Sequence, residues 1–408
     1  MELKEICELI VDCEHKTAPT QEAGYPSIRT PNIGRGRFIL DGVNRVSEET
    51  YRLWTRRAVP QPGDLIMARE APVGNVAMIP PGLKPCLGQR TLLIRPDHSK
   101  VEPSFLNYFL NGPHVQGLIH AKTNGATVAH LNMKDVRTME LPALPTLPVQ
   151  RRIAGILSAY DDLMDNSQRR IRILEAMARA LYSEWFVRFR FPGHENLPRV
   201  ASPIGDIPQG WEVKTVAESF EISGGGTPSR KEEKYWEGGT IQWFSPSDLT
   251  GAGTIFMDDS SDHITELGLA ESSARLFPAF SVMLTSRATI GAIAINTHEA
   301  CTNQGFITCL PNERVPLYFL FYWLTENVPT FQRMASGATF KEISRGVFKT
   351  IEFLQPPAKL VRRFENIVAP MADQALALQR QIQNLHRTRD LLLPRLLSGQ
   401  VDLVESQL

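Results

Sequence analysis

The sequence predicts an α+β protein in which two mixed α/β domains are separated by two long helices that pair antiparallel as a coiled coil. Three observations lead to this fold class. Short signals occur twice in the same order, strand-and-turn patterns change abruptly into long helical patterns, and the two helical patterns share a heptad spacing. The chain is therefore expected to be an internal repeat with pseudo-twofold symmetry.

The repeat is visible as five pairs of segments, whose separation falls from 288 − 71 = 217 to 362 − 151 = 211 residues. They are Ala71–Ala77 with Ala288–Ala294, Gly88–Arg90 with Asn303–Gly305, Pro103–Leu106 with Pro316–Phe319, Gly125–Val128 with Gly337–Phe340, and Arg151–Ile153 with Arg362–Phe364. Each pair alone is a weak signal, but several in one order are hard to obtain by chance. Two diverged copies favour recognition of a two-part target, although a duplication can also simply enlarge a scaffold.

The composition is that of an ordinary globular protein, with 42% hydrophobic residues in a chain of 408, enough for two to three domains. No apolar run approaches the roughly 18 residues of a membrane span, and the acidic start Met1–Glu5 is unlike a secretory signal. Five irregularly spaced cysteines indicate a reducing compartment, so a cytoplasmic protein is expected. Cys13–His15 lacks a second ligand pair at finger-like spacing, so no metal site is expected.

The charges balance, with 44 basic and 44 acidic residues, which by itself argues against a nucleic-acid partner. However, only 12 of the cations are lysines, which leaves 44 − 12 = 32 arginines, the residue better suited to phosphates and guanine edges. One stretch with few acids contains seven of them: Arg29, Arg35, Arg37, Arg45, Arg52, Arg56 and Arg57. This stretch fits a solvated surface as well as it fits contacts to phosphates.

The first domain is expected over residues 1–147, with short strands, turns and little regular helix. Asp64–Ala68 and Thr91–Ile94 have strand patterns beside Pro/Gly punctuation. The proline-rich Leu141–Pro148 is interpreted as non-helical and as the end of the domain.

A central spacer helix is expected over residues 148–191. Its seam alternates steps of four and three residues, with polar Ser167 and Arg170 inside a pattern of apolar or near-apolar positions at 149, 153, 156, 160, 163, 174, 177 and 181. Pro192 and Gly193 then break the helix and open a linker over residues 192–207.

The second domain is expected over residues 208–357, followed by a C-terminal spacer helix and tail over residues 358–408. Adding 211 to the first seam gives a second, mostly apolar seam from Leu360 to Leu392, in which Pro370 is expected to cause a kink. Helices of about 40 residues are roughly 60 Å long. Because both seams are narrow, each helix is expected to pair with the other one, the alternative being that each packs on its own domain.

This order of domains and helices resembles the specificity subunit of type I restriction-modification systems, and the resemblance covers essentially the whole chain. Several phrases carry it: Asp12–Thr17 and Ile207–Val213 at the entries to the two recognition domains, Gly225–Pro228, Trp243–Leu249, Trp185-Phe186 near the end of the central helix, and Leu391–Gly399 in the closing helix. Each phrase is loose, and together they are specific.

The resemblance implies a noncatalytic DNA-specificity subunit with two target recognition domains. Each domain would read one half of a bipartite target in double-stranded DNA, and the helices would set the gap and dock two methyltransferase (modification) subunits, joined by motor-nuclease (restriction) subunits. This chain is expected to bind no cofactor itself, whereas S-adenosylmethionine, ATP and Mg²⁺ are expected in the partner subunits.

The nearest alternative is the same kind of subunit in a system with differently arranged cleavage and methylation parts. An alternative of another class is a duplicated coiled-coil adaptor that binds proteins and not DNA.

Direct readout of a base requires paired donors and acceptors at the groove floor, set among contacts to the DNA backbone. In the first domain the candidate DNA-binding residues are His15, Lys16, Thr17, Arg29, Asn32, Arg35, Arg37, Gln89, Arg90, Asn124 and Thr127. In the second domain they are Thr227, Ser229, Arg230, Lys231, Ser245, Ser247, Arg287, Asn303, Gln304, Ser336 and Thr339. For any one of them a surface or turn role is at least as plausible, so the loops are the firmer prediction.

Aromatic residues permit two interpretations. Trp243 and Phe244 are expected in a core strand rather than stacked on bases. Leu181, Trp185 and Phe186 fit either the docking of modification subunits or packing within the chain.

No catalytic constellation is recognisable in the sequence. Asn303–Phe306 keeps only the ends of an amino-methyltransferase tetrapeptide, and Gly224–Lys231 lacks the closing Gly-Lys-Ser/Thr of a phosphate loop. Pro96-Asp97 has no nearby acidic-x-lysine partner of a metal nuclease, and the histidines form no triad.

Overall fold

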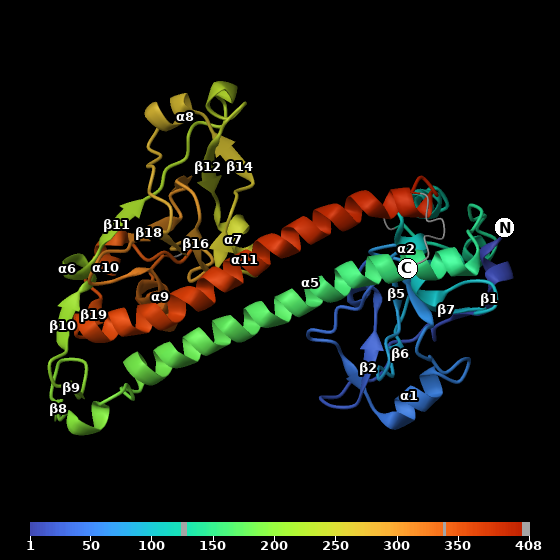
Figure 1. Ribbon diagram of the computed structural model, residues 1–408, viewed down its shortest axis with the longest axis horizontal. Helices are drawn as coiled ribbons and strands as arrows, with labels where there is room; N and C mark the ends of the chain where they lie inside the picture. The colour runs from blue at the N-terminus through green and yellow to red at the C-terminus, as the bar shows by residue number, and fades with distance from the viewer. Residues whose placement is uncertain (124–128, 338–339, 402–408) are drawn as a thin grey trace, which may run out of the picture. The chain divides into compact units, whose positions relative to one another are not determined.

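The computed structural model describes residues 1–123, 129–337 and 340–401, and the chain forms two compact units. The first contains Met1–Ser167 and the residues from Gln381 onward, and the second contains Gln168–Arg380. In each unit a β-rich body lies against segments of two long helices, α5 (Leu147–Tyr182) and α11 (Ala358–Leu397) (Figure 1). The bodies are called body 1 (residues 1–141) and body 2 (residues 207–355) below. Across the described ranges, no helix is long and apolar enough to cross a membrane.

Body 1 consists of two small sheets with helices packed against them. The larger sheet has the order β1 (Cys7–Asp12), β7 (Thr91–Pro96), β4 (Leu65–Ala68), β5 (Val76–Met78) and is antiparallel throughout. In the smaller sheet, β2 (Tyr25–Ile28) pairs antiparallel with β3 (Arg45–Val46) and parallel with β6 (Cys86–Leu87). The helices are α1 (Glu48–Trp54), α2 (Pro103–Asn111), α3 (Pro113–Ala121) and α4 (Met133–Arg137), with short 3-10 turns at Leu3–Ile6 and Thr30–Asn32.

Body 2 has the same two sheets. The larger has the order β11 (Glu221–Gly224), β18 (Phe306–Leu310), β15 (Val282–Thr285), β16 (Ile293–Asn296), β13 (Phe256–Met257). In the smaller, β12 (Ile241–Phe244) pairs antiparallel with β14 (Asp262–Ile264) and parallel with β17 (Ala300–Thr302). Two-stranded pairs join β8 (Arg199–Val200) to β9 (Ile207–Pro208) and β10 (Glu212–Thr215) to β19 (Glu352–Gln355). The helices are α6 (Val216–Ser219), α7 (Pro246–Ala252), α8 (Glu266–Ala270), α9 (Leu317–Met334) and α10 (Arg345–Lys349), with a 3-10 turn at Glu233–Tyr235.

The expected internal repeat is confirmed strand by strand. The sheet order β1-β7-β4-β5 corresponds to β11-β18-β15-β16, and β3-β2-β6 corresponds to β14-β12-β17, with the same parallel pair in each copy. Even the antiparallel β10–β19 pair has a counterpart in body 1, reduced to a single bridge between Glu2 and Glu140. The two copies therefore differ mainly in loops and in the side chains that those loops carry.

The long helices pair antiparallel within each unit, as predicted. In the first unit, Ile153 of α5 shares a core with Leu396 of α11, and eight residues further along α5 the Asp161 carboxylate binds Arg389 at 2.6 Å. In the second unit, the ring of Tyr182 at the end of α5 lies 5.7 Å from that of Phe364 near the start of α11. Each unit thus combines one body, the start of the helix that follows it and the end of the other repeat's helix.

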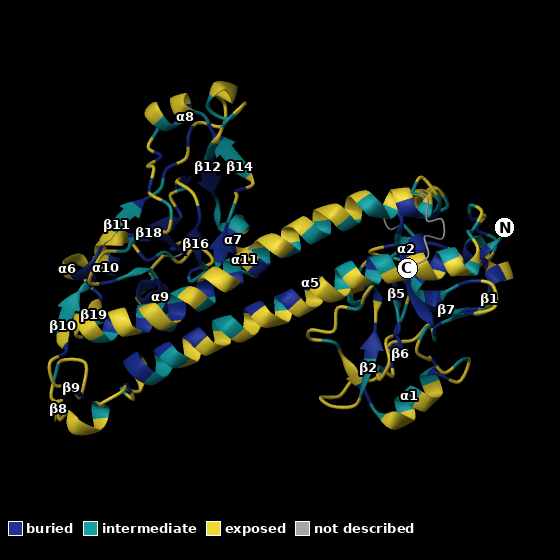
Figure 2. Ribbon diagram, in the orientation of Figure 1, coloured by how far each residue is buried: buried dark blue, intermediate teal, exposed yellow. Residues whose placement is uncertain are grey.

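The heptad spacing is correct, and one of the two predicted seam positions is buried as expected, with Ile153 and Ser167 in α5 and Phe364 and Leu378 in α11. The other position is displaced by one residue. Buried residues recur every seven positions along α5 and the turn after it, at Gln150, Leu157, Met164, Ile171, Ala178 and Trp185 (Figure 2). In α11 they recur at Val361, Val368 and Ala375 and again at Leu396. The predicted Leu163 and Met177 are instead 43% and 50% exposed. Because 361 − 150 = 211, both helices keep the same offset after the correction.

Other boundaries need correction for reasons of local chemistry. Body 1 has more helix than expected, because Pro103 and Pro113 stand at the first positions of α2 and α3, where proline is favoured. Likewise Pro148 lies in the first turn of α5, where a missing N–H costs nothing. The central helix continues as a π turn over Ser183–Val187 and ends there, short of residue 191. Pro370 lies inside α11, as expected, and the kink expected there stays a prediction.

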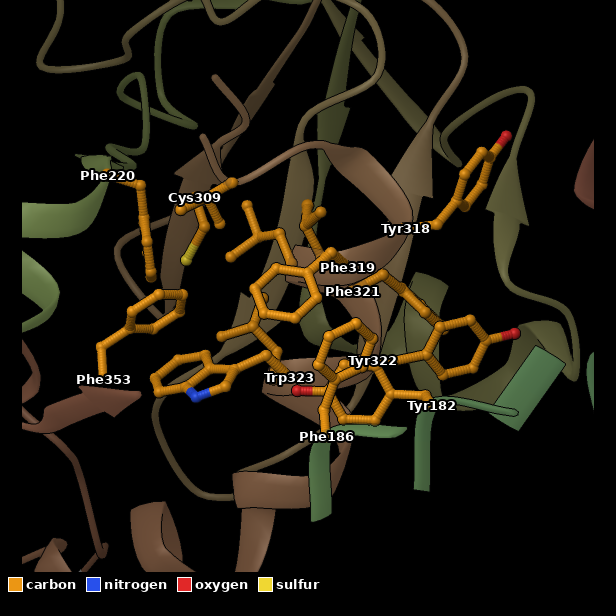
Figure 3. Close-up of a cluster of buried hydrophobic side chains, with 14 of the residues drawn as sticks. Tyr182, Phe186, Phe220, Cys309, Tyr318, Phe319, Phe321, Tyr322, Trp323 and Phe353 are labelled. Carbon is orange, nitrogen blue, oxygen red and sulfur yellow. The ribbon is translucent and has the colours of Figure 1, made fainter. Parts of the chain in front are cut away.

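Aromatic side chains at the end of α5 and in the turn after it pack against body 2 (Figure 3). The ring of Phe186 lies 4.8 Å from that of Phe319 in α9 and 5.1 Å from that of Phe364 in α11. Trp185 and Phe186 are only 6% and 7% exposed, and Leu181 packs against the same core. Of the two interpretations of these residues, packing within the chain is the one that the structure shows.

We expect the corrected seam to decide how much the helices stabilise the fold. Leu157→Ala removes a side chain that is 0% exposed and should lower the free energy of unfolding by about 2–5 kcal/mol. Leu163→Ala changes a side chain of the same size that is 43% exposed and should cost less than about 1 kcal/mol. Urea denaturation followed by circular dichroism compares the two. Equal losses, or a larger loss for Leu163→Ala, would contradict this register.

Candidate DNA interface

In body 1, two parallel strands bring predicted residues together. Ser27 and Ile28 of β2 align with Cys86 and Leu87 of β6, so the loops that follow the two strands leave from the same edge. Arg29 begins one loop and Gly88-Gln89-Arg90 forms the other. The contact is close, since a Cβ on Gly88 would lie 2.6 Å from Cγ of Arg29 and 2.7 Å from the Ile28 carbonyl oxygen. Only glycine therefore fits between these loops without displacement.

A chain of acidic and basic side chains joined by hydrogen bonds runs through this edge. Asp12 binds His15 at 3.1 Å and the Arg69 guanidinium at 2.8 Å. Arg69 Nη2 also lies 3.0 Å from Nε2 of His130. The Nδ1 atom of His130 lies 2.7 Å from the Glu70 carboxylate, which binds Arg90 at 2.8 Å on its other oxygen. Six side chains from four chain segments thus form one connected network.

The network is buried in the middle and open at its two ends. The side chains of Arg69, Glu70 and Asp12 are 7%, 15% and 17% exposed, whereas those of His15 and Arg90 are 66% and 61% exposed. The inner charges are therefore compensated within the protein, and they hold the outer groups in place. Arg90 also has a positive φ of 64°, which sets the direction of its loop. Two of the predicted residues, His15 and Arg90, end this network.

Other predicted residues of body 1 have different surroundings. Lys16 and Thr17 are exposed next to His15, and the Gln89 amide donates to the His15 carbonyl at 3.3 Å. The Asn32 amide is used within its loop, accepting from the Arg29 N–H and donating to the Ile39 carbonyl. The Arg37 guanidinium binds Asp165 of α5 at 2.9 Å, and Arg35 is exposed. Asn124 and Thr127 lie outside the described residues.

Among the described residues, two members of the network, Asp12 and His15, lie with Cys13 in a group whose spacing would suit a metal. Its chemistry does not favour a cation. Both Asp12 oxygens already accept from the Arg69 guanidinium, and burial raises the pKa of the Cys13 thiol, which keeps it protonated at neutral pH.

Body 2 repeats the arrangement at the ends of its parallel strands. Phe244 of β12 aligns with Thr302 of β17, so Ser245 and the pair Asn303-Gln304 follow at one edge. The Thr227 hydroxyl donates to the Gln304 side-chain oxygen at 2.6 Å. Ser245 caps α7 through Asp248 at 2.7 Å, and its hydroxyl contacts that of Ser247.

A shallow depression of about 220 Å³ lies at this edge. It is lined by Pro246, Arg287, Ala288, Asn303, Gln304, Gly305 and Phe340. Arg287 is held near Glu342 at 3.8 Å, and the Asn303 side-chain oxygen accepts from the Gly305 N–H at 2.8 Å. Phe340 is 58% exposed, and with Pro246 and Ala288 it makes part of the lining apolar. The depression therefore offers amide, guanidinium and aromatic groups within one small area.

The segment from Gly226 to Lys231 contacts two tryptophans through hydrogen bonds and a cation–π interaction. The Arg230 guanidinium lies over the Trp236 ring at 3.5 Å from its centroid, and the Trp236 N–H donates to the Ser229 carbonyl at 3.0 Å. Trp243 is 3% exposed and donates to the Gly226 carbonyl, and Phe244 is fully buried. Both belong to the core, as expected. Lys231 and Ser336 are exposed, and Thr339 lies outside the described residues.

Sequence reasoning missed Arg69, Glu70 and His130 in body 1 and Phe340 in body 2. The repeat contained a signal for one of them, since Glu70 stands where the second copy has the predicted Arg287 (287 − 70 = 217). His130 had no such signal, because its ring meets Glu70 across 60 residues of sequence. Phe340 follows the predicted residue Thr339 directly, but an apolar side chain does not have the donors and acceptors on which the prediction was based.

Comparison with known proteins gives one consistent result. A family model described as the Type I restriction modification DNA specificity domain matches residues 1–176 and residues 208–365. The solved structure of a type I restriction-modification S subunit from M. genitalium has a TM-score of 0.64 and 17% identity, and the alignment covers 97% of this chain and 95% of that one. At this identity the likeness concerns the fold.

Three curated relatives carry related names. The type I restriction enzyme MjaIX specificity subunit of Methanocaldococcus jannaschii is 34% identical over 172 residues, covering 42% of this chain but only 40% of that protein. The putative MjaX specificity subunit of the same organism is 22% identical over 418 residues, covering 98% and 92%. The HindI specificity subunit of Haemophilus influenzae is 22% identical over 370 residues, covering 76% and 80%.

We expect the edge of body 2 to depend on Gly225. A Cβ there would lie 2.0 Å from the Asn303 carbonyl oxygen and 2.3 Å from that of Thr302, so Gly225→Ala must displace backbone. The cost should be about 1–3 kcal/mol, with faster hydrogen exchange at residues 225–228 and 302–305. Gly251→Ala in α7, where a Cβ meets no atom within 4 Å, is the matched control and should neither lower the stability nor speed exchange at these loops. Unaltered exchange in Gly225→Ala would show that the two loops are not coupled.

Proposed function

We propose that this chain selects the DNA sequence on which a type I restriction-modification complex acts, and the premise is its family: the chain belongs to the type I restriction-modification DNA specificity family. It carries two recognition domains, one in each unit. The loops at the strand ends of body 1 would contact one half of a bipartite duplex target, and those of body 2 would contact the other half.

The observation that carries this proposal is that equivalent loops share a scaffold and differ in chemistry. At the same place in the two copies, the pair Glu70–His130 is replaced by Arg287–Glu342, so the sign of the first charge is inverted. Arg90, the open end of the network in body 1, corresponds to Gly305 (305 − 90 = 215). A reader of one repeated sequence would have no reason to diverge in this way. Two different half-sites would require it.

The groups at these edges suit direct readout in the major groove. An arginine such as Arg90 can donate two bonds to N7 and O6 of guanine, and the amides of Gln89 and Gln304 can bond both edge atoms of adenine. Arg29, Lys16 and Lys231 are exposed nearby in the two bodies and would contact phosphates, which position the protein without reading sequence. The zero net charge is compatible with this, because affinity depends on local charge at the contact.

The partners follow from the same family. We infer that two modification subunits bind the chain, that motor-nuclease subunits join them, and that S-adenosylmethionine, ATP and Mg²⁺ act in those partners. A type I complex requires a member that supplies specificity, and the relatives carry that name. The adaptor alternative loses support because these relatives are specificity subunits.

Mapping of methylated bases tests the role of the chain. DNA from cells that express this chain with its modification subunit should carry a methylated two-part motif, and DNA from cells with the modification subunit alone should not. The motif depends on the chain because only the chain supplies base contacts. An unchanged methylation pattern in the presence of a soluble complex would contradict the proposal and favour an adaptor.

Arg90 should contribute to affinity for specific DNA, and Arg52 should not. Arg90→Ala in the complex with modification subunits should raise the Kd for target DNA about 10-fold to 100-fold, the equivalent of 1–3 kcal/mol for a lost bidentate contact. Arg52 is exposed in the same body but binds Glu48 on α1, and Arg52→Ala should change the Kd less than about 2-fold. Fluorescence titration at fixed salt measures both. Equal effects would place Arg90 outside the interface.

A further inference from the structure

One end of the paired helices contains a polar triad that the other end lacks. In the first unit, Asp161 of α5 accepts from the Tyr108 hydroxyl at 2.6 Å and from the Arg389 guanidinium at 2.6 Å. The side chains of Asp161 and Arg389 are 30% and 24% exposed. Burial alone would lower the pKa of Arg389, but its hydrogen bonds to Asp161 and to Asp390 of the same helix raise it. The triad joins body 1, α5 and α11 at one point.

The equivalent positions in the second unit are apolar. The repeat offset of 211 relates Asp161 to Ala372 of α11 and Arg389 to Ala178 of α5. The offset of 213 in the preceding helix relates Tyr108 to Phe321. Ala178, Phe321 and Ala372 are 2%, 5% and 6% exposed, and all three belong to one hydrophobic core. The two helix pairings in the molecule therefore follow the same geometry with opposite chemistry.

This difference bears on which helices can pair. Because Arg389 and Ala178 are equivalent, pairing α5 with the α5 of a second copy would place Ala178 opposite Asp161 and leave the carboxylate without its guanidinium. Because Asp161 and Ala372 are equivalent, pairing α11 with another α11 would leave Arg389 opposite Ala372, with only the exposed Asp390 of its own helix as a partner. A half-buried charge that loses its partner is costly, whereas a pair of alanines costs nothing. Only α5 with α11 satisfies both positions.

We propose that the Tyr108–Asp161–Arg389 triad makes the interface between the two repeats selective for the other repeat over a second copy of the same repeat. The heptad seams alone do not provide this selectivity, because both repeats bury residues at equivalent positions. The triad acts as a register and partner signal, the role for which polar groups in coiled coils are best attested. If the proposed function holds, it also ensures that each complex carries one reader of each kind.

The test uses the full-length chain, which is cleaved at one site after it has folded. A specific protease site is inserted in the exposed turn at residues 202–205, between β8 and β9. Cleavage leaves an N-terminal and a C-terminal half of different mass, held together by the paired helices. Native mass spectrometry after prolonged incubation then counts mixed pairs against pairs of identical halves.

The wild-type protein should give mixed pairs almost exclusively. The double variant Asp161→Ala with Arg389→Ala places alanine at the equivalent helix positions of both repeats, and identical pairs should rise toward about half of all pairs, the random proportion. The charge exchange Asp161→Arg with Arg389→Asp keeps a complementary pair and should restore mixed pairs. Asp258→Ala with Arg380→Ala removes an ion pair between α11 and body 2 that does not involve α5, and should leave mixed pairs dominant.

Three results would overturn the inference. The first is the same proportion of identical pairs in the wild type and in the double-alanine variant, whether high or low. The second is separated, unpaired halves in that variant, which would mean that the triad stabilises without selecting. The third is a charge exchange that behaves like the double-alanine variant, since the sign complementarity would then be irrelevant.

Discussion

The structure depends on the burial of one side of α5 and one side of α11 at seven-residue intervals. This stripe fixes the antiparallel pairing within each unit, from Leu157 and Leu396 in the first to Ala178 and Val368 in the second. It also completes both cores, because the end of α11 packs on body 1 and the end of α5 packs on body 2. Neither repeat buries its apolar surface with its own helix alone. The chain is consequently a duplicated protein whose copies cannot be structurally independent.

The two bodies share one strand arrangement but carry different side chains at its edge. The scaffold leads each parallel strand pair, β2 with β6 and β12 with β17, to an edge where two loops meet. Because the strands fix where the loops begin, side chains at the edge can change without cost to the core. A compensated network of six charged or ionisable groups occupies one edge, and a small depression lined by polar and apolar side chains, with an exposed phenylalanine, occupies the other. Shared support and divergent edges are what recognition of two unlike half-sites requires.

The parts that the sequence predicts are those specified by local pattern. The repeat, the two long helices and the loops around Gln89 and Ser245 could all be found, because heptads and turn residues act over a few positions. One of the two seam positions in each heptad could not, since Leu163 and Met164 are both apolar and only packing distinguishes them. The charge network could not either, because Glu70 meets His130 through folding across 60 residues. For the same reason the sequence did not indicate that Arg37, predicted as a DNA contact, binds Asp165.

The central claim is that each body reads its own half of the target, and methylation mapping of two double variants tests it most directly. One variant carries His15→Ala with Arg90→Ala in body 1, and the other carries Arg287→Ala with Gln304→Ala in body 2. The account predicts that each variant relaxes the sequence at one half of the methylated motif, leaves the other half intact, and that the two affected halves differ. Relaxation of the same half by both variants, or of both halves by either one, would contradict it.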